Sequence, residues 1–104
     1  MLKIINNTIC LCRGDDCALR LELLKDGNAY TLQKGDSVEF ATSFGLTKTA
    51  GYAGDVFADV IISSTDTANI EAGKYTYTIT LHYADGTQTA LTVPQPMIIM
   101  EVAD

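Results

Sequence analysis

The most regular pattern in the chain is an alternation of apolar and polar residues over 74–83. Tyrosine and aliphatic residues occupy every second position, and most of the residues between them are threonine. Side chains of a β-strand point alternately to opposite faces, so one set enters a core and the other meets solvent. We therefore predict a strand here, with Tyr75 and Tyr77 directed into the core.

Turn residues follow this strand and divide the C-terminal part of the chain. The sequence Ala-Asp-Gly-Thr at 84–87 predicts a tight hairpin, because Asp-Gly tolerates the positive φ angles that such turns need. A partner strand is expected over 88–93. Pro94 and Pro96 then mark an edge or a crossing between sheets, since proline donates no ladder hydrogen bond. A last strand is expected over 97–102.

The first half of the chain carries shorter runs of the same kind. We predict strands over 3–10, 18–25, 29–32, 37–42 and 56–62, the last nearly all apolar and therefore central. The glycine-containing stretch 44–54 predicts a loop, and polar residues 63–69 predict one helical turn begun by Ser64 or Thr65. Short strands at this spacing are typical of an all-β sandwich or barrel.

A short motif sharpens this prediction. Residues 71–77, Glu-Ala-Gly-Lys-Tyr-Thr-Tyr, resemble the stretch that opens the penultimate strand of immunoglobulin domains. There a tyrosine hydroxyl bonds to upstream backbone as a tyrosine corner, a role that falls here to Tyr75, while Tyr77 stands at the usual cysteine position. The chain departs from the pattern in having no Trp and no inter-sheet cysteine pair. We expect one immunoglobulin-like antiparallel β-sandwich of about seven to nine strands over residues 1–104.

Composition excludes several classes of function. The 104 residues suit one domain, and 13 acidic against 7 basic residues give a net charge of −6. This balance argues against nucleic acid and anionic membranes as partners, because both require clustered Lys and Arg. No stretch approaches the roughly 20 apolar residues of a membrane helix, and the N-terminus does not read as a signal peptide.

Three cysteines, Cys10, Cys12 and Cys17, crowd into the N-terminal part of the chain. Structural zinc takes four ligands, and a secreted disulfide framework uses an even number of cysteines. We expect no metal and no cofactor, and we expect the protein to fold in a reducing compartment. The main interpretation of the three cysteines is that they serve as small apolar side chains. A disulfide between Cys12 and Cys17 across a turn stays open as an alternative.

Other potential sites have simpler structural interpretations. Arg13-Gly14-Asp15 matches the tripeptide that integrins read, but it also predicts a turn in which Asp15 or Asp16 bonds local backbone. The only histidine, His82, lies on the outward face of the threonine-rich strand, where we expect it to be solvated. General acid–base catalysis requires a partner and an orienting group, so we do not expect an enzyme.

Two apolar regions are candidate interfaces. Phe44, Leu46 and Tyr52 lie in the expected loop with nothing local to bury them, and either core capping or protein contact would explain them. The terminal strand carries apolar residues on both faces, so Met97 and Ile99 are expected to meet a loop or a partner chain. The residues with an expected structural role are Gly73, Tyr75, Tyr77, Asp85 and Gly86.

The order of these motifs is similar to that in the N-terminal domain of the baseplate upper protein family, and to small immunoglobulin-like proteins of phage and prophage tail clusters. The motifs are Arg13-Gly14-Asp15-Asp16, the strand 18–25, Gly35-Asp36-Ser37-Val38-Glu39-Phe40, the strand 73–79, the hairpin 84–87 and the strand 97–102. The resemblance implies a non-enzymatic structural protein, assembled into a virion in the bacterial cytoplasm.

Its implied partners are other tail or baseplate proteins, with a homo-oligomer in the particle as a further arrangement. The alternative function is a bacterial surface or adhesion module that binds through its loops.

Overall fold

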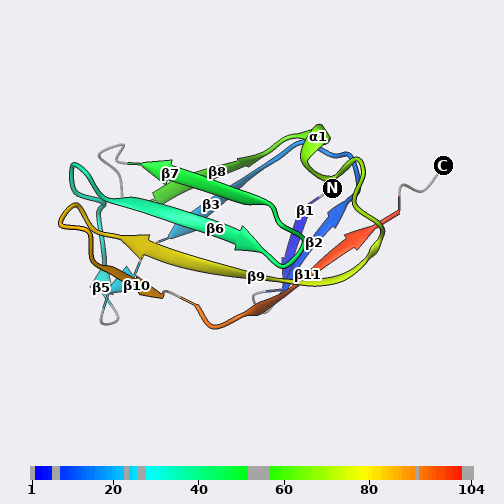
Figure 1. Ribbon diagram of the computed structural model, residues 1–104. Helices are drawn as coiled ribbons and strands as arrows, with labels where there is room; N and C mark the ends of the chain where they lie inside the picture. Colours follow the sequence, from blue (N-terminus) through cyan, green and yellow to red (C-terminus); the bar gives the residue numbers. More distant parts are fainter. Residues whose placement is uncertain are drawn as a thin grey trace.

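A computed structural model of the protein describes residues 2–5, 8–22, 24–25, 28–51, 57–90 and 92–101. These residues form short strands and one helical turn (Figure 1). The elements are β1 (Leu2–Ile5), β2 (Thr8–Cys12), β3 (Cys17–Glu22), β4 (Leu24–Lys25), β5 (Asn28–Ala29), β6 (Ser37–Thr42), β7 (Thr47–Gly51), β8 (Phe57–Ile62), α1 (Ser64–Thr67), β9 (Gly73–His82), β10 (Gln88–Ala90) and β11 (Gln95–Met100).

The strands form two layers. The large sheet has the order β1-β2-β11-β9-β6-β7, and β10 pairs with the C-terminal part of β9. The second layer is the antiparallel pair β3-β8, while β4 and β5 form a separate small ribbon. The large sheet curls over β3 and β8 (Figure 1). The predicted all-β sandwich is therefore confirmed.

The pairing of the terminal strand differs from the prediction. β11 lies between β9, to which it is antiparallel, and β2, to which it is parallel, so the large sheet is mixed. No hairpin joins β2 to β11, and a direct hairpin is what forces antiparallel pairing. Of the two roles expected for Pro96, an edge or a crossing, the edge does not hold, because β11 has a paired strand on each side. Pairing with β2 begins only at Met97, so no bond to β2 needs the missing N–H.

Other element boundaries also differ. The expected strand 3–10 is a hairpin of β1 and β2, and most of the expected strand 29–32 is loop. The expected loop 44–54 contains the strand β7, because a turn centred on Gly45, with φ 95°, folds threonine-rich residues back onto β6. β8 pairs only with β3 among the described residues, so it is not central.

Alternation along the strands builds the core. Tyr77 is 5% exposed and stacks on Phe40 with ring centroids 5.4 Å apart, so an aromatic pair fills this part of the core. Ala58 and Val60 of β8 close the core from the second layer. The remaining buried apolar residues are Ile9, Leu11, Leu19, Leu32, Val38, Ala50, Ile62, Ile79, Leu81, Met97 and Ile99.

The expected tyrosine corner is present. The Tyr75 hydroxyl donates to the Glu71 carbonyl at 2.6 Å, and the half-buried ring packs edge-on against Phe44 at 4.9 Å between centroids. Gly73 opens β9, but a Cβ there would meet only the Tyr75 ring at 3.9 Å, an ordinary contact. The backbone therefore does not require glycine at position 73.

The hairpin after β9 forms as predicted. Gly86 has φ 92° and donates its N–H to the Tyr83 carbonyl, while Asp85 Oδ1 accepts the N–H and hydroxyl of Thr87 at 2.9 and 2.6 Å. The loop before β6 approaches this hairpin closely: Gly35 has φ 94°, and a Cβ on it would lie 2.7 Å from the Cβ of Ala84. Only glycine fits there.

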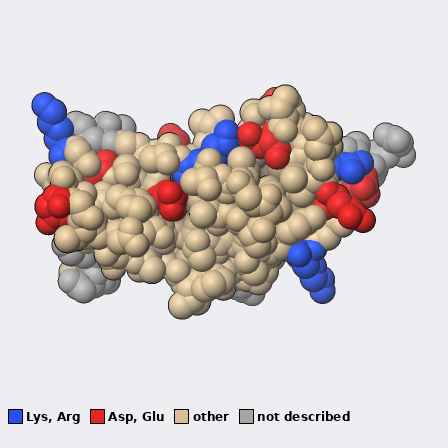
Figure 2. All heavy atoms as spheres, viewed as in Figure 1, with Lys and Arg blue, Asp and Glu red and all other residues tan. Residues whose placement is uncertain are grey.

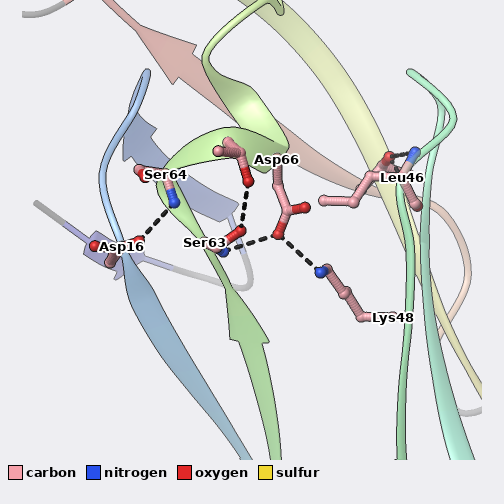
Figure 3. Close-up of polar contacts among 8 residues, drawn as sticks. Asp16, Leu46, Lys48, Ser63, Ser64 and Asp66 are labelled. Atoms are coloured by element: carbon pink, nitrogen blue, oxygen red, sulfur yellow. Dashed lines mark hydrogen bonds and ion pairs between the residues drawn. The ribbon is translucent and has the colours of Figure 1, made fainter.

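A polar network joins the two layers near α1 (Figure 3). Asp66 accepts the N–H of Ser63 at 2.8 Å and pairs with Lys48 of β7 at 2.9 Å, while Asp16 accepts the N–H of Ser64 at 2.5 Å. Burial raises the pKa of Asp66, but its bonds with Lys48 and Ser63 outweigh burial and leave the pKa below its usual value. The helical turn is present as predicted, but its N-cap is Ser63 and not the expected Ser64 or Thr65.

Candidate docking surface

Met97 and Ile99, expected at an interface, belong to the core. They are 0% and 1% exposed, and they point inward because β11 lies inside the large sheet. Their side chains therefore present no surface to a partner, and the expectation that they contact one is corrected.

The loop candidates also pack inward. Phe44 and Leu46 are half-buried against the core cluster, and the loop is pinned by the Thr42 hydroxyl, which accepts the N–H of Leu46 at 3.0 Å. Of the two interpretations left open for this loop, core capping therefore describes these two side chains. Tyr52 lies outside the described residues.

The opposite face of β11 carries a surface that we call the outer apolar strip: Cys10, Cys12, Pro96, Ile98 and Met100. Because Met97 and Ile99 point inward, Pro96, Ile98 and Met100 point outward. Register places Cys10 beside Ile98 and Cys12 beside Met100. None of the five belongs to the core cluster or packs against it. The apolar character of both faces was visible in the sequence, but the outward face was assigned wrongly.

The rest of this outward face carries few charges. Threonines of β9 and β7 and small residues of β6 occupy most of it, and Glu39 and Lys74 are the charged residues at the described outward positions of β2, β6, β7, β9 and β11. Figure 2 shows a mostly uncharged surface over β9, with acidic atoms in the left half of the face and other charged side chains toward the two ends and the upper margin. Short uncharged side chains on a sheet face can approach another protein at little desolvation cost.

His82 is less solvated than expected. Its side chain is 35% exposed, but Nε2 is buried, lies 3.8 Å from Glu39 Oε1 and has no hydrogen-bond partner among the described residues. Register sets His82 between Ser37 and Gln88. The ring nitrogen is therefore enclosed by neighbouring strands rather than presented at an open site.

The cysteines do not converge. Cys10 and Cys12 lie on the outward face, whereas Cys17 packs against the core, and all three are free thiols. Burial raises the pKa of the Cys17 thiol, which disfavours the thiolate that binds metals. No cluster of three or more metal-ligating side chains occurs within the part of the chain that the structure describes.

The Arg-Gly-Asp tripeptide forms a tight turn after β2. Gly14 has φ 83° and donates its N–H to the buried Thr67 hydroxyl at 2.9 Å, while Arg13 pairs with Glu101 at 2.8 Å. Asp16, one of the two acids expected to bond local backbone, instead accepts the N–H of Ser64, far along the chain. The turn thus fastens α1 to the sandwich.

Two apolar residues within the expected strands 56–62 and 88–93 are exposed and not buried. Ile61 is 59% and Val93 is 71% exposed. Ile61 lies on the outer side of β3-β8 beside the Arg20–Asp59 ion pair, and Val93 precedes Pro94 at the start of the crossing into β11. The alternation of β8 contained the signal for Ile61, but the continuous apolar run concealed it.

Comparisons of the chain with protein-family models, curated proteins and solved structures found no match. Among the described residues, no helix has the length and apolar character needed to cross a membrane.

Proposed function

We propose that this protein is a non-enzymatic structural component of a phage or prophage tail or baseplate, where it acts as a protein–protein docking module. The observation that carries the docking role is the outer apolar strip, which the sandwich core leaves on the outside of β2 and β11. The resemblance of motif order to baseplate upper proteins supports the location in a virion.

The strip supports docking on energetic grounds. Full burial of an Ile or Met side chain contributes about 1.5–3 kcal/mol, so Ile98 and Met100, already half-buried, would each contribute about 1 kcal/mol on contact. Apolar contacts of this size at the centre of an interface, with uncharged threonines around them, match the usual pattern of an apolar core within a polar rim.

The geometry also favours one mode of docking. β2 and β11 are both internal strands, so their backbone groups are already paired across the sheet. A partner therefore contacts side chains on the sheet face, and does not add a strand at this place.

The test begins with the genes that flank the coding sequence. We expect tail or baseplate genes there, and we expect one of their products, co-expressed with this chain, to co-elute with it in size-exclusion chromatography. Ile98→Lys should abolish the complex, because a lysine ammonium on the strip cannot be buried without cost.

Thr80→Lys is the matched control, because it places the same side chain on the same sheet face away from the strip. It should leave the complex intact, and both variants should melt near the wild-type temperature. Complex formation that survives Ile98→Lys contradicts docking through the strip. Flanking genes for export or adhesion proteins contradict the virion proposal and favour the adhesion alternative.

A further inference from the structure

The strand register places basic residues on both sides of the outer apolar strip. Across the sheet, β1 pairs Lys3 with Cys10, β2 pairs Cys10 with Ile98, and β9 pairs Lys74 with Ile98. The cross-strand row is therefore Lys-Cys-Ile-Lys. The Lys74 side chain is exposed, and no hydrogen bond or ion pair joins it to another described residue.

This arrangement is unusual for such an acidic chain. The protein has 13 acidic and 7 basic residues, so a random neighbour of an apolar patch would more often be acidic. Among the described outward positions of β2, β11, β9, β6 and β7, Glu39 is the one acid. It lies on β6, two strands away from β11. Glu101, which directly follows Met100, is paired with Arg13 at 2.8 Å, so Lys74 is the charged side chain beside the strip that no described residue neutralises.

We propose that the outer apolar strip binds an acidic segment of a partner protein, in which one or more apolar side chains lie between carboxylates. The apolar side chains contact Ile98 and the neighbouring cysteines, and a carboxylate pairs with Lys74. This inference rests on the proposed docking function and adds the chemistry of the partner. Opposite charges at the rim of an interface steer association and select among partners.

A second copy of this chain fits the strip less well. If two copies docked through their strips, the Lys74 side chain of each would lie near that of the other, and like charges repel. The net charge of −6 on each copy also opposes association. An acidic segment of another protein meets Lys74 with complementary charge and does not bring two Lys74 side chains together.

The experiment selects ligands from a displayed library of random dodecapeptides, with the wild-type protein as bait and Ile98→Lys as the counter-selection bait. The enriched peptides should carry Asp or Glu beside apolar residues. A synthetic peptide of the enriched sequence should bind about tenfold more weakly to Lys74→Glu, and Lys74→Gln should have a smaller effect. Lys34→Glu, a reversal of an exposed lysine in the loop before β6, should bind as wild type does.

Salt provides an independent readout, because a paired carboxylate makes binding weaken as ionic strength rises from about 0.05 to about 0.5 M. Peptides that lose binding with Ile98→Lys but keep it with Lys74→Glu, or that are basic, overturn the acidic chemistry and leave docking intact. No enrichment over the counter-selection bait overturns the acidic-segment proposal, and the co-elution experiment decides docking separately. Self-association of wild type in sedimentation velocity, lost in Ile98→Lys, identifies a second copy as the occupant and also overturns the acidic partner.

Discussion

Asp36 is the buried carboxylate on which the loop before β6 depends. It is 5% exposed, and its Oδ2 accepts the Tyr30 hydroxyl at 2.6 Å and the Gln33 N–H at 3.0 Å. Its Oδ1 accepts the N–H of Ala84 at 3.0 Å, from the hairpin after β9. One side chain thus joins the loop to a hairpin 48 residues away. We predict that its removal destabilises the fold more than any surface acid does.

The magnitude follows from the three donors. A hydrogen bond to a charged acceptor contributes about 1.5–3 kcal/mol, but the half-buried Tyr30 hydroxyl can turn partly to water when its partner is lost. Asp36→Ala should therefore cost about 3–5 kcal/mol of unfolding free energy. Asp36→Asn can keep its oxygen toward Tyr30 and Gln33 but sets an NH2 group against the Ala84 N–H. Asp36→Asn should therefore cost about 1.5–3 kcal/mol of unfolding free energy, which is the contribution of one hydrogen bond to a charged acceptor.

Urea unfolding followed by circular dichroism measures both values. Asp59→Ala is the matched control, because Asp59 is an exposed acid that pairs with Arg20, and surface ion pairs contribute less than about 1 kcal/mol. If Asp36→Ala unfolds within about 1 kcal/mol of wild type, the three bonds do not hold the loop and the reasoning is refuted.

Four further predictions concern other contacts. Tyr75→Phe removes the bond to Glu71 and should lower the unfolding free energy by about 0.5–1.5 kcal/mol in urea; an unchanged midpoint contradicts a stabilising corner. Ile99→Lys buries an unpaired charge and should cost about 4 kcal/mol or more, whereas Ile98→Lys should stay within about 1 kcal/mol; thermal melting distinguishes them, and equal losses would show that β11 has no outward face. The hydrogen bond to Asp36, together with burial, raises the pKa of Tyr30 from 10.0 to about 12. The stability that this bond contributes is therefore complete below pH 10 and is lost as the pH rises toward 12. Wild type should lose stability in this range faster than Tyr30→Phe, and parallel curves would disprove the contribution of the Tyr30 hydroxyl. Burial raises the pKa of Asp66, but its bonds with Lys48 and Ser63 outweigh burial and lower the pKa from 3.8. The contribution of Asp66 to stability is therefore present above pH 3.8 and is lost as the pH falls through the pKa of the folded state. Acid titration of wild type against Asp66→Asn should show this extra loss of stability only in wild type.

The sequence by itself determined the local elements whose causes lie in neighbouring residues. Alternation places Tyr77 in the core, Asp85-Gly86 makes the hairpin, and the stretch 71–77 makes the tyrosine corner, since each depends on backbone preferences within a few residues. The same local information failed at residues 44–54. The glycines there predicted a loop, although the threonine-rich residues between them form β7.

Only the tertiary structure decided which face of β11 is outside. Residues 97–100 are apolar throughout, so their pattern is equally compatible with either orientation, and a shift of one residue exchanges the two faces. The parallel pairing with β2 and the antiparallel pairing with β9 remove this ambiguity by fixing Met97 and Ile99 inward. Pairing between strands more than 80 residues apart depends on how the whole core packs, and no local preference encodes it. The outer apolar strip and the position of Lys74 beside it follow from that long-range register.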